Sequence, residues 1–254
     1  MVDIYANWIP KDKILTTNVW SSELSKLASN AMLAQRISSI NSLSSLCEKT
    51  GANIEELSKA IGMDHRIGPK FLKASVGFGG SCFQKDILNL VYLCKYYGLE
   101  EVAEYWHQVI KINDYQKNRF AQKIIDHFGG DLTDKKITIL GWAFKANTND
   151  SRESPAIYVA EKLFRAGAIL EIHDPMVSKE SIFKDIDFYW ESPKTKDLTT
   201  RILVLDSIST LDLSFDATAI LTEWEAFKNV DFSKTVVFDG RGVLSSSRYS
   251  IGKG

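Results

Sequence analysis

The residues with the clearest chemical potential lie in one glycine-rich stretch from Ser75 to Asp86, which reads SVGFGGSCFQKD. Three glycines in four positions allow the backbone to adopt positive φ and to approach a ligand closely. An apolar run from Ile87 to Tyr97 follows at once and predicts a helix. Cys82 would then lie at a helix N-terminus, where free N–H groups and the positive end of the helix dipole stabilise a thiolate.

A carboxylate accompanies this thiol. Asp86 follows Cys82 by four residues, which places both side chains on one side of the first helical turn. Such a pair suits covalent catalysis with a hydrolytic step. The sulfur attacks a carbonyl carbon, and the carboxyl group acts as general acid or base on the water. A glycine turn followed by a buried, inert cysteine is the alternative, because free cysteine is among the most buried residue types. The stretch alone does not decide between these two interpretations.

A long helix is predicted before this stretch. Residues 21–48 carry an apolar stripe of helical period, and Ser21 or Ser22 is the predicted cap. Lys26 and Asn30 are four residues apart and therefore neighbours on another face of this helix. A solvated helix face is the simpler interpretation of such a pair, so the helix pattern by itself assigns them no chemistry.

A basic segment links that helix to the glycine-rich stretch. A short helix is predicted for residues 53–61, and a loop with Arg66, Lys70 and Lys73 follows it. Basic side chains beside a flexible backbone are typical of an anion site, such as one for phosphate. Scattered surface cations would give the same pattern.

The pattern changes after a further predicted helix at residues 101–127. Residues 137–140 predict a buried strand, residues 155–166 a helix and residues 168–173 another strand, which together form a βαβ unit. More strands are predicted at 202–205, 217–221 and 235–238. We therefore expect a connecting segment with a strand-like run (1–20), an all-helical unit (21–130) and an open parallel α/β sheet (131–254).

Composition narrows the class of protein. The chain has 254 residues and a net charge of -1, which gives no indication of a nucleic acid or membrane partner. No apolar run is long enough to span a bilayer, and the N-terminus lacks the order of a signal peptide. Three widely spread cysteines predict a reducing, cytoplasmic environment, and the four histidines show no metal-ligand spacing, so we expect no metal site.

Taken together, these motifs resemble those of the UDP-glucose 6-dehydrogenases, within the UDP-glucose/GDP-mannose dehydrogenase family. The resemblance runs from about Ile4 to Val243 and is most specific at the cysteine stretch. The segments that carry it are Trp20 to Asn30, Gly68 to Ser75, Gly77 to Asp86, Gly141 to Lys145, Asp150 to Ser154 and Phe238 to Arg241. The resemblance implies a Rossmann-like fold for the sheet unit.

The resemblance also implies an activity. Family enzymes oxidise the 6-hydroxymethyl group of UDP-glucose to a carboxylate with two NAD per turnover. By this resemblance Cys82 is the nucleophile that forms a thiohemiacetal and then a thioester. Lys26 and Asn30 stabilise the oxyanion and position water, and Asp86 helps to activate that water.

Binding roles follow from the same resemblance. The residues implied for UDP-glucose are Arg66, which reaches a neighbouring subunit's site, Phe71, Lys73, Ala74, Ser75, Val76, Gly77, Phe78, Gly79, Phe144, Lys145 and Arg241. Those implied to face NAD are Phe83, Gln84, Lys85 and Arg152. A homo-oligomer that pairs through the helical unit is also implied.

One departure from the family pattern affects these expectations. No Gly-x-Gly-x-x-Gly follows any predicted strand, so the dinucleotide fingerprint of the family's N-terminal NAD domain is not in this sequence. We therefore expect the chain to be a fragment that is inactive alone. Two alternatives remain open: a related GDP-mannose or UDP-N-acetylhexosamine dehydrogenase, and a non-catalytic module that binds UDP-sugar and oligomerises. A cysteine hydrolase is a remote third, since no motif places a histidine beside Cys82.

Overall fold

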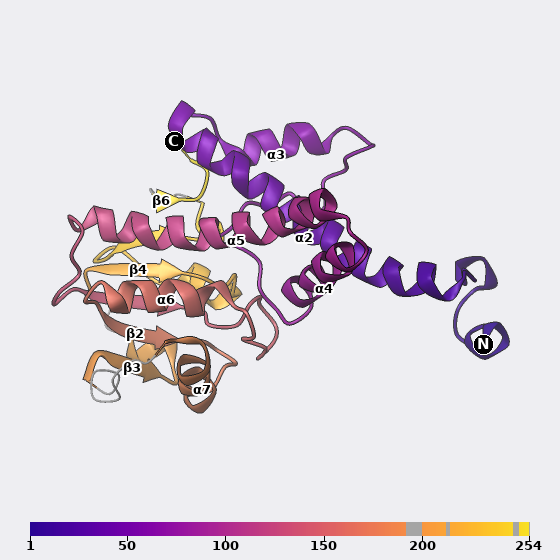
Figure 1. Ribbon diagram of the computed structural model, residues 1–254. Coiled ribbons are helices and arrows are strands. Elements are labelled where there is room, and N and C mark those ends of the chain that lie inside the picture. The colour runs from indigo at the N-terminus through magenta and orange to yellow at the C-terminus, as the bar shows by residue number, and fades with distance from the viewer. Residues whose placement is uncertain (192–199, 212–213, 246–248, 254) are drawn as a thin grey trace.

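The helical part of the chain is built around two long helices (Figure 1). The structure is a computed structural model, and it describes residues 1–191, 200–211, 214–245 and 249–253. The helices are α2 (Val19–Thr50), α3 (Ile54–Gly62), α4 (Phe83–Tyr96) and α5 (Glu100–His127). α2, α4 and α5 pack on one another around small and branched side chains such as Ala31, Ala34 and Ile87. No helix among the described residues is long and apolar enough to cross a membrane.

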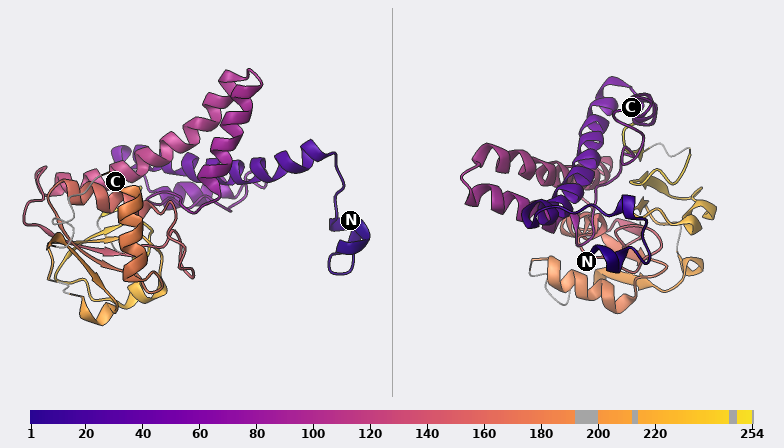
Figure 2. Two further views of the ribbon diagram at one scale, coloured as in Figure 1. Left: turned by 60° about the horizontal axis from the view of Figure 1, so that its bottom comes forward. Right: turned by 90° about the vertical axis from the view of Figure 1, so that its right-hand side faces the viewer.

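The N-terminal segment differs from the sequence expectation. A strand-like run was expected in residues 1–20, but the structure has a short helix α1 (Val2–Tyr5) and a 3₁₀ turn (Lys11–Lys13). The run has no neighbouring strand to complete its backbone hydrogen bonds, so local turns satisfy them instead. This segment extends beyond the exposed first turns of α2, away from the rest of the chain (Figure 2).

The caps of the helices are set by local side chains. Asn18, and not Ser21 or Ser22, caps α2, because its side chain accepts the Ser21 N–H at 2.8 Å. Asn53 caps α3 as predicted, and Ser154 caps α6 (Pro155–Arg165) with proline at the first helical position.

Helix α5 belongs to two cores. Its first half contributes Ala103 and Ile110 to the core shared with α2 and α4, whereas its second half contributes Phe120 and Ile124 to the core of the sheet. The second half lies beside α6, as Figure 1 shows. This shared helix fixes the sheet relative to the cysteine stretch. The domain boundary expected at residue 130 stays a prediction.

The second part of the chain is a parallel sheet, as predicted. Its strands lie in the order β3-β2-β1-β4-β5-β6, with every neighbouring pair parallel. They are β1 (Lys136–Leu140), β2 (Ile169–His173), β3 (Ile202–Leu205), β4 (Ala217–Ile220), β5 (Val236–Asp239) and β6 (Tyr249–Ser250), and α7 (Lys179–Tyr189) follows β2. The central strands are buried on both faces, which explains their continuous apolar sequences.

The topology of the sheet identifies where a ligand is expected. The chain progresses from β1 through β2 to β3 on one side, and then returns so that β4 pairs with the other side of β1. Such a reversal opens a crevice at the carboxyl ends of the two central strands, and open α/β sheets bind ligands there. The loops that follow β1 and β4 therefore form one side of the candidate site.

Candidate active site

Buried amide side chains hold the glycine-rich stretch against the helices. The Ser75 N–H donates to Asn41 Oδ1 at 2.8 Å, and Gln116 Nε2 donates to the Ser75 carbonyl at 2.8 Å. Asn113 pairs with Phe78 in both directions, since its Oδ1 accepts the Phe78 N–H at 2.8 Å and its Nδ2 donates to the Phe78 carbonyl at 3.0 Å. All three amides are almost completely buried. They fix the backbone of the stretch before any ligand arrives.

Two glycines of the stretch are required by close packing. A Cβ atom on Gly79 would lie 2.4 Å from the Glu153 carbonyl oxygen and 3.0 Å from the Phe144 Cβ. Gly80 has a φ of 85° and donates its N–H to the Arg152 carbonyl at 2.8 Å. The stretch is thus pressed against the loop that follows β1, and the helical and sheet parts meet at this point.

Cys82 is accessible, unlike the other two thiols. It occupies the cap position of α4, and it is exposed, whereas Cys47 and Cys94 are buried. The alternative of a buried cysteine is therefore wrong for Cys82, and its catalytic role stays a prediction.

Asp86 is the centre of a small hydrogen-bonded group beside Cys82. Lys26 Nζ donates to Asp86 Oδ2 at 2.6 Å, and Asn30 Nδ2 donates to the same oxygen at 2.5 Å. Burial raises the pKa of the Asp86 carboxyl as the largest single effect, but the hydrogen bonds from Lys26 and Asn30 and the nearby positive charges together outweigh it and lower the pKa. The Lys26 pKa is raised, chiefly because its ammonium donates to Asp86. The interpretation of Lys26 and Asn30 as a merely solvated face is therefore wrong.

This ion pair predicts a pH-dependent effect for Lys26→Met. A carboxyl whose folded-state pKa is depressed adds stability above its ordinary pKa of about 3.9, and that stability is lost as the pH falls through the folded value. Lys26→Met should therefore raise the Asp86 pKa and lower the melting temperature at neutral pH, with a smaller difference from the wild type below about pH 4. NMR titration of the Asp86 carboxyl and melting curves across pH measure both.

The control is Lys111→Met, which removes an ammonium from Glu104 in another ion pair. It should leave the Asp86 titration unchanged. If the Asp86 pKa were the same in Lys26→Met and Lys111→Met, Lys26 would not be the cause of the lowered Asp86 pKa.

A cavity of about 300 Å³ lies between the glycine-rich stretch and the strand-end loops. Its described lining is Ile37, Phe71, Lys73, Ser75, Gly77, Phe78, Gly79, Phe83, Phe144, Lys145, Glu223 and Arg241. Nine of the residues expected at UDP-glucose are among these. Phe83, which was expected to face NAD, lines this cavity as well. The structure thus brings together segments that are far apart in the sequence.

Three of the residues expected at UDP-glucose lie elsewhere. Val76 is fully buried in the core of the sheet, where its N–H donates to the Gly240 carbonyl at 2.7 Å. Ala74 lines a neighbouring hollow beside α3. The Arg66 side chain is 78% exposed and pairs with Asp64, so within this one chain it does not contact the cavity.

The cations at the strand ends are positioned by hydrogen bonds to the backbone. Arg241 Nε donates to the Leu221 carbonyl at 2.8 Å, and its Nη2 donates to the Phe144 carbonyl at 3.0 Å. Burial lowers the Arg241 pKa, while Glu223 acts in the opposite direction. Asp174 Oδ2 accepts the N–H groups of Trp142 and Ala143, and so fixes the loop that presents Phe144 and Lys145. These contacts fix the Arg241 side chain and the loop that carries Lys145 at one edge of the cavity.

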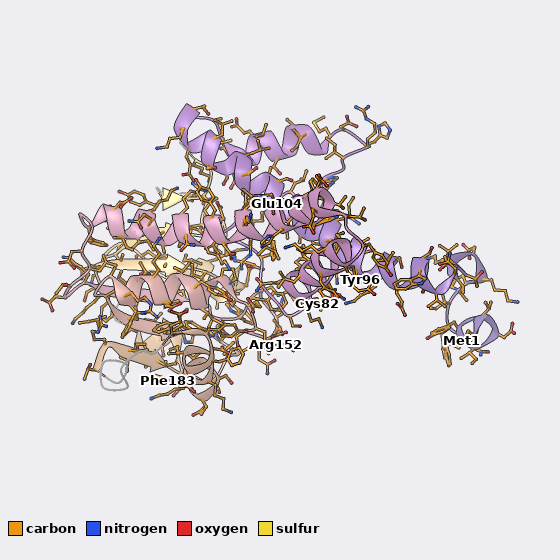
Figure 3. All side chains as sticks on the ribbon, viewed as in Figure 1. Met1, Cys82, Tyr96, Glu104, Arg152 and Phe183 are labelled. Carbon is orange, nitrogen blue, oxygen red and sulfur yellow. The ribbon has the colours of Figure 1, made fainter. Side chains whose placement is uncertain are left out.

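The residues expected to face NAD divide into two groups. Arg152 pairs with Asp150 at 2.8 Å and lies near Cys82 across the interface between the two parts of the chain (Figure 3). The Arg152 pKa is raised, first by its hydrogen bond to Asp150 and then by the negative charge of that carboxylate. Gln84 is half-buried and Lys85 is exposed on the first turn of α4, and neither of them lines the cavity.

Sequence patterns missed Ile37 and Glu223 in the lining of the cavity. Ile37 was assigned only to the apolar stripe of its helix. Glu223 follows a predicted strand at its carboxyl end, and that position was the available signal for a ligand-facing role.

Comparison with known proteins identifies the family. Residues 20–115 match the model of the UDP-glucose/GDP-mannose dehydrogenase family, central domain, and residues 138–246 match the UDP binding domain of the same family. The chain belongs to the UDP-glucose/GDP-mannose dehydrogenase family. Membership of this family confirms the resemblance that the motifs indicated.

Individual relatives in this family are similar over nearly the whole chain. "UDP-glucose 6-dehydrogenase 1" of Glycine max is 50% identical over 276 aligned positions, which cover 99% of this chain and 57% of that protein. "UDP-glucose 6-dehydrogenase" of Mus musculus is 55% identical over 251 positions, which cover 95% of this chain and 50% of that protein. The chain therefore spans about half the length of the relatives that it matches.

A solved structure from the same family has a similar fold. It is the UDP-glucose dehydrogenase of the hyperthermophilic archaeon Pyrobaculum islandicum, with a TM-score of 0.76 and 32% sequence identity. The match covers 91% of this chain and 49% of that one. This agreement confirms the fold class predicted from the sequence.

Proposed function

We propose that this chain supplies the thiol chemistry and the UDP-sugar site of an NAD-dependent dehydrogenase that converts UDP-glucose to UDP-glucuronate. The observation that carries this proposal is a cavity with three cationic side chains whose lining includes Phe83, the residue next to the exposed Cys82. Cys82 and its neighbours Lys26, Asn30 and Asp86 are not themselves among the described lining residues. The names of the relatives favour UDP-glucose over other nucleotide sugars.

The charges of the cavity favour one orientation of the substrate. Lys73, Lys145 and Arg241 would bind the diphosphate by charge-assisted hydrogen bonds. Phe83 lines the cavity and directly follows Cys82, so the sugar end would point toward the thiol. The oxidised C6 group then comes within reach of sulfur.

The proposed chemistry passes through sulfur. The 6-hydroxyl group is first oxidised to an aldehyde by loss of a proton and a hydride. The Cys82 sulfur adds to the aldehyde carbon, whose oxygen becomes a hydroxyl group. The resulting thiohemiacetal loses this hydroxyl proton and a second hydride to become a thioester. Water then attacks the thioester, which releases the carboxylate product and restores the thiol.

Lys26, Asn30 and Asp86 would bind the oxyanion and the hydrolytic water in these reaction steps. Because the Lys26 pKa is raised, its ammonium stays protonated at neutral pH and can stabilise the oxyanion together with the Asn30 amide. The lowered pKa of Asp86 makes it a weak base, so we assign it the task of orienting the hydrolytic water through a hydrogen bond.

Two molecules of NAD, bound one after the other, would accept one hydride each. The residues that fit NAD are the cationic Arg152 and the polar Gln84 and Lys85 of the first turn of α4, on the exposed side of Cys82. None of these three residues is among those that line the cavity, so different side chains would hold NAD and the UDP-sugar. The three free cysteines fit a reducing compartment, the cytoplasm.

We also propose that the chain pairs with a second copy through its helical part. The α4 and α5 helices expose large apolar side chains, including Tyr92, Tyr96 and Tyr105. Exposed apolar surface of this kind is typical of an interface. Light scattering at micromolar concentration should give the mass of a dimer, and the mass of a monomer would contradict this assignment.

The proposed substrate is tested by calorimetric titration. The dissociation constants of UDP and UDP-glucose should differ by no more than about tenfold, which is about 1.4 kcal/mol of binding free energy. The reason is that the cations of the cavity would bind the diphosphate that both ligands share. Cys82→Ala should change neither affinity, since the thiol forms its bond only after oxidation. The absence of heat and of a thermal shift with millimolar UDP, in folded protein, would contradict the proposal.

A further inference from the structure

Glu223 is the one acidic side chain among the twelve described residues that line the cavity. The same lining contains Lys73, Lys145 and Arg241, which suit a diphosphate. A carboxylate beside a diphosphate is repulsive unless another part of the ligand offers it hydrogen-bond donors. The position of Glu223 therefore carries information about the uncharged part of the ligand.

The backbone at Glu223 is fixed on both sides. Thr222 Oγ1 donates to the Ala143 carbonyl at 2.6 Å, and Trp224 Nε1 donates to Asp174 Oδ2 at 3.1 Å. Both neighbours are buried. The Thr222 contact joins the end of β4 to the loop after β1, and the Trp224 contact joins it to the end of β2. Glu223 is thus held at the point where the order of strands reverses.

The Glu223 carboxylate has a charged neighbour but an unused acceptor. Its Oε2 lies 3.4 Å from Arg241 Nε, whose hydrogen is donated to the Leu221 carbonyl. Oε2 is buried and has no hydrogen-bond partner among the described residues. A buried acceptor without a donor is costly, and an ionised carboxylate offers about four acceptor positions.

The groups of a bound UDP differ in what they could offer. The diphosphate offers no donor at neutral pH. The uracil edge presents one N–H between two carbonyl oxygens, and a carboxylate facing that edge would be repelled by both. The ribose presents two adjacent hydroxyl groups, which the two oxygens of one carboxylate can accept together. Acidic side chains near the strand ends of other nucleotide-binding α/β sheets accept ribose hydroxyls in this way.

We infer that Glu223 accepts hydrogen bonds from the ribose hydroxyls of the bound nucleotide, and that it selects ribonucleotides over 2′-deoxyribonucleotides. This inference rests on the proposed function, because it takes UDP as the occupant of the cavity. The same carboxylate weakens the binding of free anions that bring no hydroxyl groups, because repulsion is then uncompensated.

Titrations with UDP, 2′-deoxy-UDP and pyrophosphate test this inference. The wild-type chain should prefer UDP to 2′-deoxy-UDP by about tenfold, equivalent to about 1.4 kcal/mol. Glu223→Ala should reduce this preference below about threefold and should bind pyrophosphate at least as tightly as the wild type. Glu223→Gln keeps the shape but loses the charge, so its preference should fall between the two.

The matched control is Glu225→Gln, which removes the same charge two residues further on. The Glu225 side chain is 82% exposed and pairs with Lys228 on the surface. This variant should keep the full preference for UDP. If Glu223 only oriented Arg241, Glu223→Ala would weaken UDP and 2′-deoxy-UDP equally and would also weaken pyrophosphate.

The outcomes separate this inference from the proposed function. Tight binding of UDP with equal affinity for 2′-deoxy-UDP in the wild type would overturn the role of Glu223 alone. An effect of Glu223→Ala that appears with UDP-glucose but not with UDP would mean that the hydroxyls belong to the sugar, and would also overturn it. Failure of the folded wild type to bind UDP would overturn both.

Discussion

Arg241→Ala is expected to weaken the binding of UDP by about a hundredfold, which corresponds to about 2.7 kcal/mol. Arg241 is 9% exposed, and its guanidinium donates to the Leu221 and Phe144 carbonyls. Its removal takes one cation from the cavity and leaves both carbonyl groups without a donor. It also leaves the Glu223 carboxylate without its charged neighbour at 3.4 Å. Losses of this kind are large when a buried, hydrogen-bonded charge is truncated.

Two further variants make the Arg241 result specific. Arg241→Lys keeps the charge but not the planar fork that reaches two carbonyls, so it should recover only part of the affinity. Arg165→Ala removes an arginine that pairs with Glu161 on α6, away from the cavity, and should leave UDP binding unchanged. Binding of UDP by Arg241→Ala within threefold of the wild type would place the diphosphate elsewhere.

Gly79→Ala is expected to disturb the site and the fold together. The added Cβ would lie 2.4 Å from the Glu153 carbonyl oxygen, so the glycine-rich stretch or the loop after β1 must move. Forcing an extra methyl group into such packing costs about 1–3 kcal/mol of stability. Since the same contact shapes the cavity, UDP affinity should fall by about tenfold or more. Chemical denaturation and calorimetry measure the two effects.

Gly98→Ala is the matched control for Gly79→Ala. Gly98 has a φ of 71° between α4 and α5, and a Cβ there would meet no atom within 4 Å. Its replacement should lower stability through backbone strain, by about 1–3 kcal/mol, without changing UDP affinity. If the two variants lost UDP affinity equally, the loss would report general destabilisation and not the shape of the cavity.

Local signals predicted most of the elements that form the site. The apolar runs before Gly141 and Asp174 identified β1 and β2, and the cap at Ser154 identified the start of α6. Helix α7 and strand β6 were not predicted, although Ser178 does cap α7 by accepting the Ser181 N–H. Strand β6 has two residues, too few to show any periodicity.

Sequence patterns alone could not supply the contacts between distant segments. The pairing of Asp86 with Lys26 joins residues 60 positions apart, and only the packing of α4 on α2 brings them together. Family resemblance, and not helix periodicity, indicated a shared role for them. The buried amides of Asn41, Asn113 and Gln116 were not recognised, because a polar residue in a helix is expected to be exposed.

The most direct test of the central claim is affinity labelling of Cys82 through the cavity. The probe is a UDP-sugar that carries a chloroacetyl group at C6, and peptide mass spectrometry locates the adduct. If the cavity and the thiol form one site, binding holds the electrophile beside sulfur, and labelling should exceed that by free chloroacetamide by about a hundredfold or more. We expect one adduct, on Cys82 and not on the buried Cys47 or Cys94, and we expect excess UDP to suppress it. Labelling of Cys82 that UDP does not slow would show that the cavity and the thiol are not parts of one site.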